Sequence, residues 1–236
     1  MNRRAFLIGA VALSAPPPFA DGQSVIIDGE ERVLTDVIAP SSQPLSGRAE
    51  PFADFAAAAL SAAIEAGAPQ GKPRARDRWA RATGPVLWTM HGRTTTLQEI
   101  LLAQGAARVA PQSADFTFIE RCFRAEKAAR KARLGLWGHP AYRVRDAASA
   151  ENGWGYQIYA GVVRASAERG RRVFLNFGDD FRADFTASVA RGDFRRWRAK
   201  KDLASFVGET VEIRGYVEWI NGPSIDLRHE MQLRAA

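Results

Sequence analysis

Basic side chains gather in one short polar segment of the chain. Residues 71–81 read GKPRARDRWAR, where four basic residues stand at alternate positions and another arginine follows: Lys72, Arg74, Arg76, Arg78 and Arg81. In an extended segment alternate side chains project to the same side, so this spacing would build a row of cations able to hold a phosphate or another anion. The alternative interpretation is a solvated loop, and the spacing does not separate the two.

The last third of the chain offers a different kind of binding residue. Phenylalanines stand at 174, 177, 181 and 185, and exposed aromatic rings beside a cationic groove stack the bases of single-stranded nucleic acid. Phe174 and Phe177 fall on opposite faces of a predicted strand, so the rings cannot all be exposed. Phe174 and Phe181 are the candidates for stacking, and a barrel core is the alternative role for most of the set.

A second basic group follows on a helix predicted at about residues 192–204. Its members all lie on that helix: Arg195, Arg196, Arg198, Lys200 and Lys201. Phe194 and Trp197 are three residues apart and are predicted to point inward. A solvated helix face is the simpler interpretation of the basic residues.

Residues for other chemistry are scattered. His91, His139 and His229 lack the spacing of a zinc site, and Gly-rich phosphate loops are absent from the sequence. Cys122, the single cysteine, falls on the apolar face of a predicted helix, which indicates a core residue and excludes an internal disulfide. The sequence therefore predicts no metal and no cofactor.

Charge and the N-terminus indicate the kind of partner and the compartment. The 236 residues carry 33 Lys and Arg against 26 Asp and Glu, a balance that attracts nucleic acid, phosphates or anionic lipid without choosing among them. Residues 1–20 open with MNRRAFLIGAVALSA, a positive start and an apolar run shorter than the about 20 residues of a membrane span. Arg3-Arg4 resembles a twin-arginine export signal. We expect a periplasmic or secreted protein, membrane-anchored if the signal stays uncleaved.

The elements that would position these residues form two groups. Residues 24–40 predict a β-hairpin with its turn at Asp28-Gly29, and helices are predicted from Pro51, from Thr96 and over 118–134. Residues 140–152 lack periodicity and are interpreted as a linker. Residues 153–236 then predict three strands, a helix and two strands, which is the order of a five-stranded OB barrel.

The helix at 118–134 carries the family resemblance. It contains AE-x-x-A-R-x-x-x-LGLW at 125–137, with Gly135 as the predicted left-handed cap, and LQEILLAQGAARV precedes it at 97–109. This pairing resembles the C-terminal part of thermonucleases, the staphylococcal nuclease-like family, over residues 21–139. The resemblance implies an OB-type barrel with added helices. The fold class is thus α+β and mainly β, with two OB-like barrels in tandem.

The resemblance also implies a site. Thermonucleases use calcium held by two aspartates, a glutamate that activates water and two arginines that neutralise the phosphate. Asp21-Gly22-Gln23-Ser24 occupies the opening motif, so Gln23 stands at the first ligand. Ala39-Pro40 fixes the second motif, which puts Val33 at the first arginine, Ile38 at the second ligand and Ser41 at the general base. Asp77-Arg78-Trp79-Ala80-Arg81 resembles the third motif and retains its arginine, Arg81.

Three functions follow from this loss of site residues. The first is an exported, catalytically degenerate thermonuclease-like protein, a binding or scaffold module for nucleic acid or for a protein partner. The second is an active calcium-dependent nuclease that hydrolyses DNA or RNA at a relocated site of Arg81, Asp36 and Asp77, near Asp21. The third is an envelope protein that never meets nucleic acid. Binding that weakens steeply with salt separates a phosphate-binding protein from the last of these.

Overall fold

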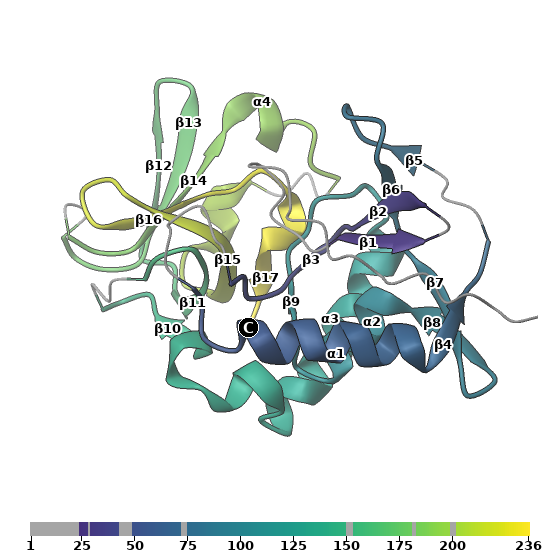
Figure 1. The fold of residues 1–236 in the computed structure, drawn as a ribbon. Helices are drawn as coiled ribbons and strands as arrows, with labels where there is room; N and C mark the ends of the chain where they lie inside the picture. Colours follow the sequence, from purple (N-terminus) through teal and green to yellow (C-terminus); the bar gives the residue numbers. More distant parts are fainter. Residues whose placement is uncertain are drawn as a thin grey trace, which may run out of the picture.

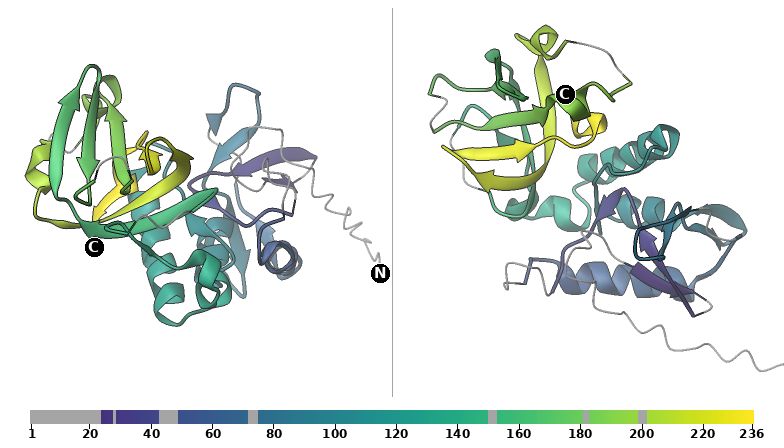
Figure 2. Two further views of the ribbon diagram at one scale, coloured as in Figure 1. Left: turned by 90° about the vertical axis from the view of Figure 1, so that its left-hand side faces the viewer. Right: turned by 90° about the horizontal axis from the view of Figure 1, so that it is seen from above.

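The protein folds into two adjoining parts, seen in a computed structural model (Figure 1). The structure describes residues 24–27, 29–42, 49–71, 75–149, 153–180, 183–198 and 202–236. The predicted export signal, Asp21 and the Asp28 turn residue lie outside these ranges. We call residues 24–142 the N-terminal part and residues 145–236 the C-terminal barrel; Figure 2 shows them side by side in two further views. Within the described ranges, no helix is long and apolar enough to cross a membrane.

The N-terminal part consists of small sheets packed with three helices. Strand β1 pairs with β2, β2 pairs in parallel with β6, and β5 adds to the far edge of β6. Two further sheets join β3 to β9 and β4 to β7 and β8. The elements are β1 (Ser24–Ile27), β2 (Glu30–Leu34), β3 (Val37–Ile38), α1 (Ala53–Glu65), β4 (Gly67–Pro69), β5 (Ala75–Arg76), β6 (Ala82–Gly84), β7 (Leu87–Met90), β8 (Arg93–Thr96), α2 (Leu97–Ala103), β9 (Arg108–Val109) and α3 (Phe116–Lys131).

Helix α3 follows its predicted amphipathic pattern but ends differently. Phe118, Ile119 and Cys122 face the core, and burial raises the pKa of the Cys122 thiol. The left-handed residue that ends the helix is Arg133 (φ 53°), where the sequence predicts Gly135. Gly135 has another reason to be glycine: a Cβ there would lie 2.4 Å from the Gly105 carbonyl oxygen. The prediction of a left-handed Gly135 (φ 52°) is right, and its role is a close approach of two backbones.

The C-terminal barrel has the connectivity of an OB fold. Strands run in the order β11–β15–β16–β14–β13–β12, and β14 pairs in parallel with β16, as strands three and five do in that fold. Strand β10 pairs in parallel with β11, so the segment after residue 140 is packed against the barrel. The elements are β10 (Arg145–Asp146), β11 (Tyr156–Val162), β12 (Ala165–Arg169), β13 (Arg172–Asn176), β14 (Thr186–Ala190), α4 (Arg191–Phe194), β15 (Thr210–Trp219), β16 (Pro223–Asp226) and β17 (Leu233–Ala235).

The helix predicted at 192–204 is wrong in length. The structure has the four residues of α4 (Arg191–Phe194), and a short 3-10 turn follows at Leu203–Phe206. Trp197 is buried and packs edge-on against Phe194, with ring centroids 5.3 Å apart, so both inward positions are confirmed. Phe194 and Trp197 thus pack against each other although α4 ends at Phe194.

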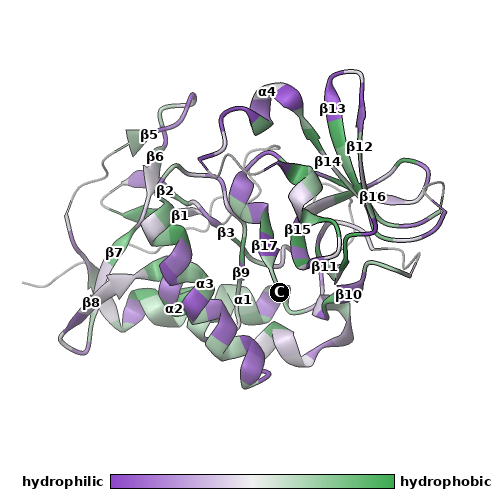
Figure 3. Cartoon of the chain, turned by 180° about the vertical axis from the view of Figure 1, so that it is seen from behind, coloured by the Kyte–Doolittle hydropathy of each residue, from purple (hydrophilic) through white to green (hydrophobic). Residues whose placement is uncertain are grey.

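Each part has its own apolar core. One cluster joins the sheets of the N-terminal part to α1, α2 and α3, and another fills the C-terminal barrel. Figure 3 shows hydrophobic residues along β13 and β14 and hydrophilic ones on α4. A small third cluster contains Ile38, Ala110 and Tyr156, and it lies between the two parts. The barrel therefore touches the N-terminal part at the strand that carries Ile38.

Candidate functional site

Arg81 lies at the end of a tight turn that Asp77 organises. One Asp77 carboxylate oxygen accepts the backbone N–H groups of Trp79 and Arg81, both at 2.9 Å. Ala80 adopts a left-handed conformation (φ 64°), which costs a residue with a Cβ more than it costs glycine. The turn feeds directly into β6 and directs the Arg81 side chain back toward Asp77.

The Arg81 guanidinium is held by carboxylates of the protein itself. Its Nε donates to Asp77 at 2.8 Å, its Nη2 lies 2.7 Å from the same oxygen, and its Nη1 lies 3.9 Å from Glu31. Desolvation alone would raise the pKa of Asp77, but the hydrogen bonds from Arg81 and Trp79 outweigh it and lower that pKa. Two acidic side chains thus face the retained arginine, and together they oppose the approach of a phosphate.

The rest of the basic segment is only partly available to an anion. Arg76 forms an ion pair with Glu30 and donates to the Ala80 carbonyl at 2.7 Å. The Arg78 guanidinium stacks on the Trp79 ring, 3.9 Å from its centroid, and that ring is 49% exposed. Lys72 and Arg74 lie outside the described residues. Among the described residues of the predicted row, Arg76 and Arg81 are paired with acids and Arg78 is stacked on Trp79.

Val33, Ile38 and Ser41, the described residues at the other thermonuclease site positions, are neither carboxylates nor basic side chains. Val33 and Ile38 are buried, and Ile38 contacts Ala110 and Tyr156 in the apolar cluster between the two parts. The Ser41 backbone N–H donates to the Glu50 carboxylate at 2.8 Å. Gln23 lies outside the described residues. An aliphatic side chain cannot ligate a cation, and a serine hydroxyl is not basic near neutral pH.

Asp36 has a structural task away from Arg81. It is fully buried in a left-handed turn (φ 66°), and one carboxylate oxygen accepts the N–H groups of Gln112 and Ser113, both at 2.8 Å. Asp77 is engaged by Arg81 instead. The described ranges hold no group of three or more His, Cys, Asp or Glu residues arranged for a metal ion. Of the relocated site, Asp77 and Arg81 are in contact, whereas Asp36 is bonded to the loop before α3.

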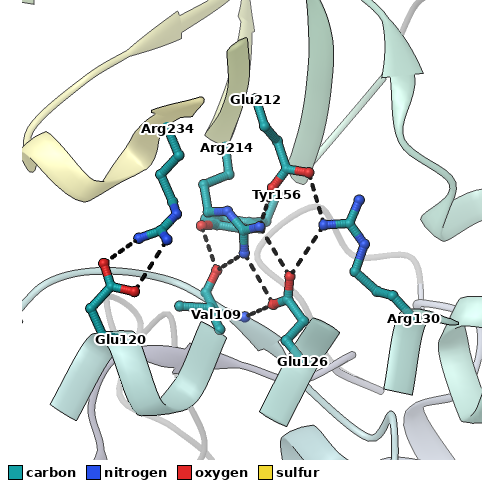
Figure 4. A network of polar contacts seen from close by, with 8 residues as sticks. All are labelled: Val109, Glu120, Glu126, Arg130, Tyr156, Glu212, Arg214 and Arg234. Carbon is teal, nitrogen blue, oxygen red and sulfur yellow. Dashed lines mark hydrogen bonds and ion pairs between the residues drawn. The ribbon is translucent and has the colours of Figure 1, made fainter. Parts of the chain in front are cut away.

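A buried ionic network joins α3 to the C-terminal barrel (Figure 4). Arg214 on β15 donates to both carboxylate oxygens of Glu126, each at 3.0 Å, and it also pairs with Glu212. Nη1 of Arg130 lies 2.8 Å from the other carboxylate oxygen of Glu212. Desolvation alone would lower the pKa of Arg214, but the Glu126 and Glu212 carboxylates outweigh it and raise that pKa. Glu126 and Arg130 belong to the AE-x-x-A-R motif, so that motif supplies the contact between the parts.

Three further contacts surround this network. The Arg234 guanidinium pairs with both oxygens of Glu120, at 2.7 and 3.1 Å. The Tyr156 hydroxyl donates to the Val109 carbonyl at 2.9 Å, next to the Arg214 donor to the same oxygen at 3.0 Å. These bonds hold β9 and α3 against the barrel, and Figure 4 shows them converging from both parts.

Arg108 on β9 has a different environment. Its side chain is buried between the rings of Tyr142 and Tyr156, 4.8 and 5.3 Å from the two centroids. Its Nη1 donates to the Tyr156 carbonyl. Burial lowers the pKa of the guanidinium, and nearby Glu50 and Glu126 offset part of this effect. Sequence reasoning missed this residue because an arginine in a two-residue strand resembles any exposed basic residue.

His229 on the C-terminal barrel contacts the loop before α3. Its Nε2 lies 3.0 Å from the Ser113 carbonyl, and its Nδ1 accepts the Met231 N–H at 3.1 Å. Both contacts are satisfied by the neutral ring with the proton on Nε2. Burial is the largest cause that lowers the pKa of this imidazole. A cavity of about 250 Å³ lies nearby, lined by Phe116, Glu120, Trp197, Phe206, Glu230, Met231, Leu233 and Arg234.

The barrel aromatics serve mostly as core, as the alternative interpretation held. Phe177 and Phe185 are fully buried, and Phe185 stacks on Tyr159 with centroids 4.1 Å apart. Phe174 is half-buried on β13, and Phe181 lies outside the described residues. In the second basic group Arg196 pairs with Asp193, and Arg198 stacks on Phe116 at 4.0 Å. The barrel aromatics that are exposed are others, namely Trp154, Tyr216 and Trp219.

Comparison with known proteins agrees with the predicted resemblance. Residues 32–139 match the model of the family described as staphylococcal nuclease homologue. A search of curated proteins gave no match. The matched range contains β2, β3, α1, α2 and α3, together with Arg81 and the AE-x-x-A-R motif. By this match, residues 32–139 are similar to staphylococcal nuclease homologues.

Proposed function

We propose that the chain is an exported member of the nuclease family that no longer hydrolyses phosphodiesters and acts as a binding or scaffold module. The observation that carries this proposal is the burial of Ile38 against Tyr156 of the barrel. The resemblance to the second thermonuclease motif puts Ile38 at the position of a calcium ligand. An apolar side chain under a tyrosine leaves no oxygen donor and no room for a hydrated cation at this position.

The state of Arg81 supports the same conclusion from the substrate side. A catalytic arginine must offer free N–H groups to the phosphate in the transition state. Here Asp77 occupies two of the nitrogens and Glu31 faces a third. Arg81 therefore has a structural role, because its bonds to Asp77 hold the turn that precedes β6.

Arg78 and Trp79 offer the best contact for an anionic chain such as nucleic acid. The exposed indole provides a face on which a base can stack, and the guanidinium beside it provides a charge for a phosphate. Among the described residues Arg78 forms no ion pair that an anion would have to displace. A protein partner in the cell envelope is the other outcome that the experiment below distinguishes.

The test is cleavage of single-stranded DNA by the full-length protein, with calcium and with a chelator. We expect no cutting in either condition. Cutting that requires calcium and disappears in Arg81→Ala would refute the proposal, because it would show a working family-type site. A cutting activity that survives Arg81→Ala would instead indicate a contaminating nuclease.

Binding is measured in the same samples by fluorescence anisotropy across a salt series. Arg78→Ala and Trp79→Ala should weaken binding, whereas Arg171→Ala, an exposed arginine of the barrel, should leave it unchanged. Phosphate contacts predict an affinity that falls steeply as salt rises. Absence of both cutting and binding would reject nucleic acid as the partner and leave a protein partner.

A further inference from the structure

Arg108 lies at the place where the nuclease family would hold its metal. In the antiparallel pair of β3 and β9, Ile38 is directly opposite Arg108. Side chains of directly opposite residues project from the same face of a sheet. The Arg108 side chain therefore lies on the same face of the sheet as Ile38, which occupies the position of a thermonuclease calcium ligand. This contact does not depend on whether the protein cleaves nucleic acid.

The guanidinium is buried, and two of its three nitrogens have no hydrogen-bond partner among the described residues. The residue is 1% exposed, and Nη1 donates to the Tyr156 carbonyl. Nε and Nη2 are buried and have no hydrogen-bond partner among the described residues. The hydroxyl groups of the flanking tyrosines are committed elsewhere, with Tyr142 bonded to Pro51 and Tyr156 to Val109.

A buried guanidinium with unpaired N–H groups is energetically unfavourable. Arginine does not lose its proton in proteins, so its charge must be balanced by a neighbour. Arg214 shows the usual solution, with the carboxylates of Glu126 and Glu212 against its guanidinium. Glu50 is the carboxylate with the strongest electrostatic effect on Arg108, but one of its oxygens is bonded to the Ser41 N–H at 2.8 Å. No ion pair joins Arg108 to a described acid.

We propose that Arg108 binds a small monovalent anion, of the size of chloride or formate, at its Nε and Nη2. These two N–H groups lie on one edge of the planar guanidinium and point in parallel, a geometry that suits a planar carboxylate or a single halide. The rings of Tyr142 and Tyr156 lie 4.8 and 5.3 Å from the guanidinium, so an occupant of this buried edge has to be small. A position that holds a cation in the family would thus hold an anion here.

The test is thermal unfolding of the full-length protein in a sodium chloride series, with sodium gluconate at equal ionic strength as the control. A ligand bound only to the folded state raises the midpoint by about 3–6 °C for each tenfold rise above its dissociation constant. Gluconate is too large to enter and should give no such rise. Sodium formate, in a third series, should act as chloride does. Equal midpoints in chloride, formate and gluconate would overturn the proposal.

Two variants test whether the anion dependence of the unfolding midpoint arises at Arg108. Arg108→Met should abolish the anion dependence, whereas Arg76→Met, which removes an exposed arginine paired with Glu30, should retain it. If Glu50 is the true counter-ion, the natural protein will show no anion dependence and Glu50→Gln will introduce one. That pattern would also overturn the proposal.

Diffraction from crystals grown in sodium bromide keeps the proposal testable if Arg108→Met does not fold. We expect an anomalous peak within hydrogen-bonding distance of Nε and Nη2 of Arg108. A site without a peak would contradict the proposal. A peak that is accompanied by no stabilisation in chloride would mark an adventitious ion and would contradict it as well.

Discussion

Replacing Glu126 by glutamine should cost the protein a large part of its stability. The carboxylate is buried, accepts two bonds from Arg214 at 3.0 Å and receives the Val109 N–H. Glutamine keeps the shape but loses the charge, and one of its terminal atoms becomes a donor that faces the Arg214 guanidinium. Breaking one partner of a buried pair costs about 3–5 kcal/mol, since the other charge is left without its balance.

The assay is urea unfolding followed by tryptophan fluorescence. With a slope of about 2 kcal/mol per molar urea, the midpoint should fall by about 2 M. Asp193→Asn is the matched control, because it removes the acid of the exposed Arg196 pair and should cost no more than about 1 kcal/mol. The double variant Glu126→Leu with Arg214→Met should recover much of the loss, since no unbalanced charge then remains from the pair.

Two outcomes would refute this reasoning. One is a loss in Glu126→Gln as small as that in Asp193→Asn, which would mean that Glu212 alone balances Arg214. The other is a double variant as unstable as the sum of its single variants, because that result would show no coupling between the two side chains.

Two other predictions concern the contact between the parts and the end of α3. The pKa of His229 in the folded protein lies below its ordinary value of 6.5. The unfolded chain therefore takes up a proton at this imidazole more readily than the folded protein does. The stability that His229 contributes above pH 6.5 should decrease as the pH falls toward the folded pKa. In His229→Gln the unfolding midpoint should lose this pH dependence between about pH 5 and 7, and an unchanged dependence would assign it to another group. Gly135→Ala should lower the free energy of unfolding by about 3 kcal/mol, from left-handed strain together with the clash against Gly105. Gly170→Ala has the same strain in open space and should cost about 1 kcal/mol, so equal losses in urea unfolding would contradict the clash.

Much of the local structure follows from short patterns in the chain. The Thr96 hydroxyl accepts the Glu99 N–H at 3.1 Å, as the predicted cap of α2 requires, and the Glu99 carboxylate receives the Thr96 hydroxyl instead of a backbone N–H. The apolar face of α3 is buried as its spacing predicts. Such features depend on residues within a few positions of one another, and a sequence displays them directly.

The candidate site was only partly predictable. The loss of ligand chemistry at Ile38 and Ser41 is a matter of residue identity, which the Ala39-Pro40 landmark places in register. The role of Asp36 was not predictable, because its partners at Gln112 and Ser113 are more than 70 residues away. The pairing of two arginines of the basic segment, Arg76 with Glu30 and Arg81 with Asp77, was not predictable from the alternate spacing of the cations.

The sequence by itself indicated the resemblance to staphylococcal nuclease, the helices of the N-terminal part and the side chains at the positions of the nuclease site. Only the tertiary structure decided what those positions do. It set Tyr156 against Ile38, placed Arg108 opposite Ile38 with no ion pair to a described acid, and joined Arg214 to Glu126. The physical reason is that burial and charge balance depend on which distant segments pack together, and local spacing along a chain carries no record of that packing.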